Sequence, residues 1–140
     1  MRFKCVPVLL SLLSTSAWAQ DPYAAADTQQ ILESCRQIHE RAIQVTEYYA
    51  FAHGCKVIAD TAVVNGAVSA HYGPVRDCAL KLGLSGSWSQ DEIASRQQDA
   101  IRRGLAQSFQ PNTCNYWHNN PQAVSTVRDY ACSVTPYCTR

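Results

Sequence analysis

The sequence lacks an apolar run long enough to cross a membrane. Its longest apolar run, residues 5–13, is well short of the about 20 residues that a transmembrane helix needs. The next most apolar segment, residues 57–68, is interrupted by Asp60, Thr61 and Asn65. We therefore expect no membrane span.

A surplus of charge is also absent. The full sequence has 12 Lys and Arg against 11 Asp and Glu, and without Arg2 and Lys4 it has ten basic and eleven acidic residues, for a net charge of −1. Proteins that bind nucleic acids or anionic membranes carry a basic surplus on one face. Neither is an expected partner.

The common catalytic motifs are missing too. There is no Gly-x-Ser-x-Gly elbow and no Cys-x-x-Cys metal-binding pair. The zinc-protease signature His-Glu-x-x-His stops after His39-Glu40, so we expect His39 to be a charged surface residue of a helix. No Asn-x-Ser/Thr acceptor occurs, which favours a bacterial periplasm over eukaryotic secretion. No cofactor and no metal are predicted.

The amino-terminal residues have the pattern of a secretory signal peptide. Arg2 and Lys4 place positive charge beside the apolar run, and residues 17–19 (Ala-Trp-Ala) match a small-x-small cleavage site. We expect residues 1–19 to be the signal peptide and residues 20–140 to be one helical, disulfide-stabilised domain. The predicted location is the periplasm or the extracellular space.

Six cysteines remain in the mature chain, and they are its most informative feature. They are Cys35, Cys55, Cys78, Cys114, Cys132 and Cys138. An even number in a short exported chain predicts three disulfides, although the count leaves the pairing open. Each bridge is worth about 2–4 kcal/mol, comparable with the whole net stability of a small domain. We therefore expect folding to require oxidation.

Apolar periodicity predicts a first long helix. Asp27 is the expected cap, with Gln30 as its capping-box partner, and Gly54 is the expected end. The apolar residues recur at three- and four-residue steps: Ile31, Cys35, Ile38, Ala42, Val45 and Tyr49. This spacing places them on one buried face.

Four more helices are predicted along the chain. The second covers residues 55–71 and stops before Gly73-Pro74, and the third begins at Pro74 and ends near Gly83. The fourth starts with a Ser89–Glu92 capping box and runs to about residue 108. The fifth opens at Asn120-Pro121 and contains Ala123, Val124, Val127, Tyr130 and Ala131. No hairpin signal occurs, so the expected fold is an all-α bundle of about five helices.

The fourth helix carries two further expectations. Its expected buried residues are Ile93, Ala94, Gln97, Ile101, Leu105 and Phe109. Glu92 with Arg96 and Asp99 with Arg103 are spaced four apart, which favours ion pairs. Trp88, just ahead of the helix, is expected in the core with Phe109.

Tyr116, Trp117 and His118 form the candidate binding patch. Tyrosine and tryptophan offer a large contact area at a low entropy cost, so in a loop just past Cys114 they suit recognition of another protein. The alternative is that Trp117 packs into one end of the bundle.

The leading hypothesis is an exported, non-enzymatic binding or inhibitor protein, because a disulfide-stapled scaffold lowers the ordering cost of binding. One alternative is a small secreted hydrolase that uses His71 with Asp77 or His53, although a helix-end packing role for His53 is favoured. Another is a structural envelope or cell-surface component, which would have neither a concave pocket nor an exposed aromatic cluster. The oligomeric state is not predicted.

Overall fold

The protein is an all-α, disulfide-stapled bundle, as the sequence predicts. The computed structural model describes residues 22–138, with side chains from residue 27 onward, so the predicted signal peptide lies outside the described residues. The elements in chain order are α1 (Pro22–Gly54), α2 (Thr61–His71), α3 (Gly73–Lys81), the 3-10 turn η1 (Gly86–Trp88), α4 (Gln90–Ser108), α5 (Asn115–Asn119) and α6 (Pro121–Val134). The five predicted helices are present, and the one-turn α5 is an addition.

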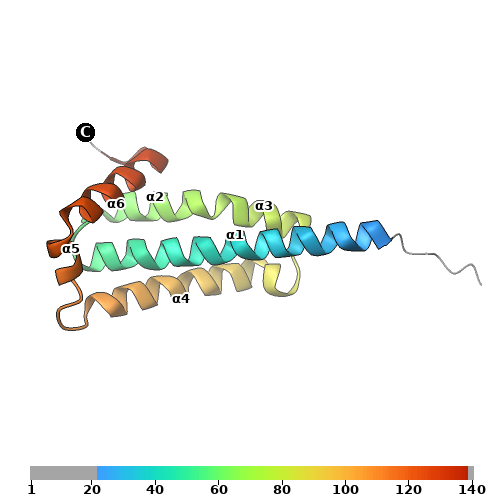
Figure 1. Cartoon of the computed structure of the whole chain (residues 1–140), viewed down its shortest axis with the longest axis horizontal. Helices are drawn as coiled ribbons and strands as arrows, with labels where there is room; N and C mark the ends of the chain where they lie inside the picture. The colour runs from blue at the N-terminus through green and yellow to red at the C-terminus, as the bar shows by residue number, and fades with distance from the viewer. Residues whose placement is uncertain (1–21, 139–140) are drawn as a thin grey trace, which may run out of the picture.

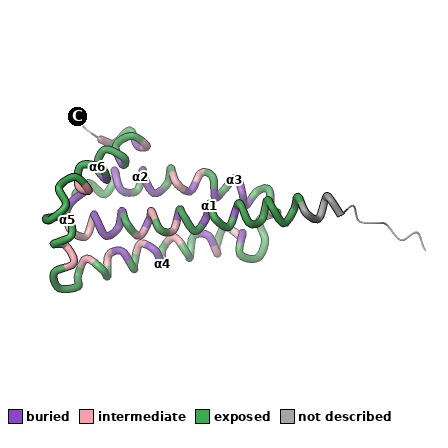
Figure 2. The backbone as a smooth tube through the Cα atoms, in the orientation of Figure 1, coloured by how far each residue is buried: buried purple, intermediate pink, exposed green. Residues whose placement is uncertain are grey.

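The long helix α1 is the axis of the bundle. It packs against α2, α3 and α4, while α6 packs on α2 and α5 at the opposite end from the start of α1 (Figure 1). Residues 27–34 are all exposed because this part of α1 projects beyond its neighbours (Figure 2). Within residues 22–138, no helix has the length and apolar character needed to cross a bilayer.

The start of α1 differs from the prediction. The helix begins at Pro22, so Asp27 lies inside it and the predicted cap is wrong. Proline is favourable at a first helical position because it has no N–H to leave unpaired. Ile31 is 45% exposed because it lies in the projecting part. The predicted stripe becomes buried only from Cys35 onward.

α1 ends in a Schellman motif. The Val57 N–H donates to the Ala52 carbonyl and the Lys56 N–H to the His53 carbonyl, at 2.9 and 3.0 Å. Lys56 takes the left-handed position, with φ of 64°, where a glycine is usual. Gly54 instead provides space, since a Cβ there would lie 2.0 Å from the Ser108 Oγ of α4.

The second predicted helix begins later than expected, at Thr61. Asp60 is its cap, and the Asp60 carboxylate accepts a hydrogen bond from the Ala62 N–H at 2.8 Å. α3 begins at Gly73, with Pro74 in its first turn, and ends in a second Schellman motif whose left-handed residue is Gly83, with φ of 81°. The predicted limits of α3 are therefore confirmed.

The start of α4 is as predicted, but one of its ion pairs is not. The Ser89 hydroxyl accepts a hydrogen bond from the Glu92 N–H at 3.2 Å, and Arg96 Nε lies 3.0 Å from Glu92 Oε1. The predicted Asp99–Arg103 pair is wrong. Asp99 pairs with Arg102 instead, and Arg103 Nε reaches Glu47 Oε2 of α1 at 2.9 Å. Arg103 therefore links two helices.

α4 packs on α1 through its small residues. Ala100 and Gly104 are buried, whereas the predicted core residue Phe109 is 84% exposed and Ala94 is also exposed. A Cβ at Gly104 would lie 2.2 Å from the Glu47 carbonyl oxygen, so the backbones approach closely at this position. Phe109 follows the last residue of α4, where no neighbouring element covers it.

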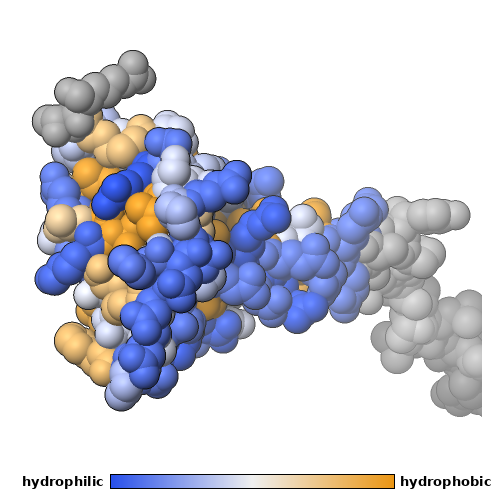
Figure 3. Space-filling view, turned by 60° about the vertical axis from the view of Figure 1, so that its left-hand side comes forward, coloured by the Kyte–Doolittle hydropathy of each residue, from blue (hydrophilic) through white to orange (hydrophobic). Residues whose placement is uncertain are grey.

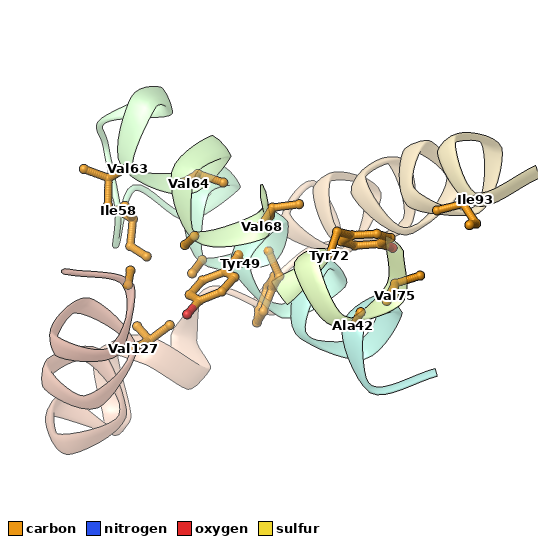
Figure 4. Close-up of a cluster of buried hydrophobic side chains, with 14 of the residues drawn as sticks. Ala42, Tyr49, Ile58, Val63, Val64, Val68, Tyr72, Val75, Ile93 and Val127 are labelled. Atoms are coloured by element: carbon orange, nitrogen blue, oxygen red, sulfur yellow. The ribbon is translucent and has the colours of Figure 1, made fainter. Parts of the chain in front are cut away.

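The core lies between α1 and its neighbours. Tyr49, Val68, Tyr72 and Val75 extend from α1, α2 and α3 into one cluster, and Val127 of α6 closes it at one end (Figure 4). Trp88 is buried, as predicted, beside this cluster. A core of this size gives a small domain only a small net stability, so the disulfides are needed to stabilise the fold.

Three disulfides join the elements. Cys35–Cys78 links α1 to α3, Cys55–Cys114 links the end of α1 to the start of α5, and Cys132–Cys138 ties the tail to α6. The predicted disulfides are confirmed, and their pairing is now known. The first two bridges join parts of the chain that are far apart in sequence.

We predict unequal losses of stability when these bridges are removed. For sequence separations of 59 (Cys55–Cys114) and 6 (Cys132–Cys138), loop-closure entropy gives about 4 and about 2 kcal/mol respectively. Denaturant unfolding of the two double alanine variants without reductant measures the difference. Equal losses in the two variants would contradict an entropic origin.

We also predict that Gly104→Ala destabilises the protein by about 1–3 kcal/mol, because the added methyl group forces α4 away from α1. Helix propensity alone would give the opposite sign. Ala106→Gly, at an exposed position of the same helix, is the control and measures the propensity effect. A stabilised Gly104→Ala variant in chemical denaturation would disprove the close approach.

Candidate functional site

Trp117 lies in the core and not in a surface patch. It is 3% exposed, and its ring centroid lies 5.0 Å from that of Tyr48 and 5.5 Å from that of Phe51. The packing alternative for Trp117 therefore holds. Tyr116 and His118 of the predicted patch do reach the solvent, and Tyr116 is 44% exposed.

Two links place α5 and α6 at this end of α1. The Cys55–Cys114 bridge fixes the start of α5, and Arg128 Nε of α6 donates to the Val57 carbonyl at 2.7 Å. The predicted cap Asn120 does not bond to an N–H of α6; its Nδ2 donates to the Tyr116 carbonyl at 2.6 Å. This bond ties the α5–α6 junction together.

A groove of about 780 Å³ runs between α1 and α6. It lies at the end of the molecule where hydrophobic side chains reach the surface among hydrophilic ones (Figure 3). Its described lining comprises Val45, Tyr48, Tyr49, Asn119, Asn120, Pro121, Gln122, Ala123, Thr126, Val127 and Tyr130. We call it the tyrosine groove. It is the candidate functional site, because it combines concave shape, aromatic rings and amide groups.

The tyrosines of the groove differ in exposure. Tyr48 and Tyr130 are 39% and 49% exposed. Tyr49 is 1% exposed, and its hydroxyl has no hydrogen-bond partner. An unpaired buried hydroxyl costs about 1–3 kcal/mol. The Tyr49 hydroxyl is thus an unsatisfied polar group in the wall of the groove.

Burial raises the pKa of two of these phenols further above the neutral range. Partial burial, and then the neighbouring Tyr116 hydroxyl, raises the pKa of Tyr48 to about 12. Burial, and then the proximity of Tyr130, raises the pKa of Tyr49 as well. The groove therefore offers uncharged hydroxyl groups at neutral pH, and these can donate as well as accept hydrogen bonds.

His71 lies behind the groove. Its ring centroid is 5.9 Å from that of Tyr49 and 5.4 Å from that of Tyr130, and its buried Nε2 has no partner. Within the described residues, no hydrogen bond or ion pair joins His71 to Asp77, which is exposed on α3. The structure does not assemble the His–Asp pair that the hydrolase alternative uses.

His53 has a structural partner. Its Nδ1 lies 2.7 Å from the Ile58 carbonyl oxygen, which accepts a hydrogen bond from the ring and fixes the turn after α1. All six cysteines of the described residues are in disulfides, so none is a free nucleophile there. In the same part of the chain, no group of three or more His, Cys, Asp or Glu residues is arranged to hold a metal ion.

His39 is not the surface residue that the sequence predicts. It is 4% exposed, with its ring centroid 5.6 Å from that of Trp88 and 6.2 Å from that of Tyr72, and its Nε2 has no partner. Burial, and then the positive charge of Arg96, lowers its pKa, although Glu92 and Glu40 act in the opposite direction. The sequence does contain a signal for the burial of His39. It lies four residues after the buried Cys35, which places both on the same face of α1.

The tyrosine groove was missed because it forms between distant segments. Tyr49 and Tyr130 lie 81 positions apart in the sequence, and each belongs to an apolar helix stripe. The sequence signal was the adjacent pair Tyr48-Tyr49, which must present one ring to the core and one to the surface of a helix. The partner helix could not be inferred from that pair.

We predict that acid destabilises the fold through its buried histidines. Burial lowers the pKa of both His39 and His71, so the unfolded chain takes up protons at a higher pH than the folded chain. Their stabilising effect is complete above pH about 6.5 and declines below it, by at most about 1.4 kcal/mol per pH unit for each histidine.

Urea unfolding between pH 7.5 and 5 tests this dependence. His39→Leu should reduce the change in the free energy of unfolding with pH. His118→Gln, at an exposed position, should leave that pH dependence unchanged. An identical pH dependence of the free energy of unfolding in wild type and His39→Leu would show that His39 does not contribute to the acid destabilisation.

Comparison with known proteins gives no further indication of function. No protein family, no curated protein and no solved structure matches this chain. The tyrosine groove and the bonds that position it are therefore the basis for inferring a function.

Proposed function

We propose that this is an exported, non-enzymatic binding protein that holds a partner protein in the tyrosine groove. The observation that carries the proposal is the groove itself, an open concavity of about 780 Å³ lined by half-exposed tyrosines and amides. Aromatic side chains of this kind supply binding energy with few rotatable bonds. The partner is expected to be a protein, as it was from the sequence.

The disulfides support both the location and the role. Three bridges within one short chain are typical of an oxidising compartment, so the periplasm or the extracellular space is the proposed site of action. Cys55–Cys114 also fixes one wall of the groove before a partner arrives. Such pre-organisation lowers the entropic cost of association.

The alternatives have less support. A catalytic His71–Asp77 pair is not assembled, and His53 is engaged with a backbone carbonyl. A purely structural envelope component would have neither a concave pocket nor an exposed aromatic cluster. The groove, with Tyr116 beside it, favours binding.

Site-specific photocrosslinking tests the proposal. A benzophenone amino acid replaces Tyr130 in the groove or, as a matched control, Phe109, an exposed aromatic residue outside the groove. After irradiation of cells that naturally export the protein, we expect a discrete protein adduct from position 130 and none from position 109. Mass spectrometry of the adduct identifies the partner.

Two results would count against this function. Equal labelling at positions 130 and 109 would show non-specific contact, and no adduct at either position would remove the groove as a protein-binding site. A further Tyr48→Ala change in the position 130 variant should weaken the adduct, because it removes the facing ring.

A further inference from the structure

The tyrosine groove has no charged residue in its described lining. The eleven residues that form it are aromatic, aliphatic, amide or hydroxyl residues, whereas Arg128 and Asp129 of the same helix line a different hollow, beside Cys55 and Cys114. A charged ligand group would lose its hydration here without gaining a counter-charge. The lining therefore favours an occupant that is uncharged where it lies in the groove.

The polar groups of the groove are available to a ligand. The side chains of Asn119, Gln122, Thr126 and Tyr130 make no hydrogen bond with the described residues, whereas Asn120 Nδ2 is already used by the Tyr116 carbonyl. The Tyr49 hydroxyl has no partner either, but it is fully buried in the groove wall and is not accessible to a ligand. Amide N–H and phenolic O–H groups can all serve as donors to a ligand that presents carbonyl oxygens.

The rings set the shape of the occupant. Tyr48 and Tyr130 belong to different helices, and each leaves between a third and a half of its surface exposed. Flat, rigid apolar rings of a ligand pack against such faces with little loss of entropy. A groove with aromatic walls and hydrogen-bond donors matches the way in which proline-rich segments are recognised, as polyproline II helices.

We propose that the tyrosine groove binds an uncharged, proline-containing extended segment of the partner protein. Proline has no N–H, so at its proline positions such a segment presents only carbonyl oxygens, and the groove supplies donors for them. Its backbone is already extended before binding, so little conformational entropy is lost. This inference rests on the proposed function and adds the chemistry of the partner.

Two displayed peptide libraries test the inference. Both contain nine-residue uncharged peptides with the same randomised positions, but one has proline fixed at positions 3 and 6 and the other has alanine there. We expect the oxidised protein to enrich the proline library at least tenfold over the alanine library. Equal enrichment of the two, or none in either, would overturn the inference.

Variants assign the binding to the groove. The most enriched peptide is synthesised and titrated into a Trp88→Phe variant, in which the intrinsic fluorescence reports Trp117, which packs against Tyr48. Tyr130→Ala should weaken binding at least tenfold, and Thr126→Lys should do the same by placing a charge in the groove without removing a core side chain. Phe109→Ala should change the affinity less than twofold. Circular dichroism confirms that each variant is folded, and unchanged binding by both groove variants would refute the assignment.

The peptide experiment can fail while the crosslinking experiment succeeds, and the reverse is also possible. Crosslinking at position 130 together with failure of the proline library leaves a protein-binding groove with a different ligand chemistry. Chitohexaose serves as an uncharged saccharide probe in the same titration, and binding of it in place of the peptides would refute the proline assignment. Library enrichment without any crosslinked partner would instead weaken the functional proposal.

Discussion

The Cys55–Cys114 disulfide is the constraint on which the candidate site depends. It joins positions separated by 59 residues and holds the start of α5 against the end of α1. With that point fixed, Trp117 packs on Tyr48 and Phe51, and α6 leaves the junction in a direction that opens the groove. The Arg128–Val57 hydrogen bond is the second attachment of α6 to this region, and as a single bond it is worth far less than the covalent link.

Several buried side chains fill the core well but leave a polar atom without a hydrogen-bond partner. His39, Tyr49, His71 and Tyr72 all have a buried side-chain nitrogen or oxygen without a hydrogen-bond partner, and each lies against aromatic rings. Large amphipathic rings fill volume between helices, and the unpaired polar atoms cost part of that gain. Among the described residues, the Trp117 Nε1 is a fifth such atom. Tyr49, His71 and Trp117 lie at or next to the groove, so three of these five unpaired groups adjoin the candidate site.

Local chemistry made parts of the fold predictable. Ser89, Pro74 and Gly83 act through their own backbone neighbours, and all three limits were confirmed. His39, Phe109 and Trp117 depend on which distant element covers them, and the sequence could not specify that. α1 ends at Gly54, as predicted, although the left-handed residue is Lys56 and Gly54 serves the close contact with Ser108. The groove is the extreme case, since its two walls meet only after α6 has been positioned.

The neutrality of the groove links its structure to its proposed role. α1 carries a mixed-sign exposed face in its first half, where Arg36 pairs with Glu33 and Glu40. Its last turns change to tyrosines, and the facing residues of α6 are amide and hydroxyl side chains. Exposed ion pairs add little stability, but they keep a surface soluble and unattractive to apolar partners. Charged residues flank the groove on both helices, as Glu47 of α1 and Arg128 and Asp129 of α6 do, but none of them is in its described lining. The partner that we propose would therefore meet an uncharged surface bordered by charged side chains.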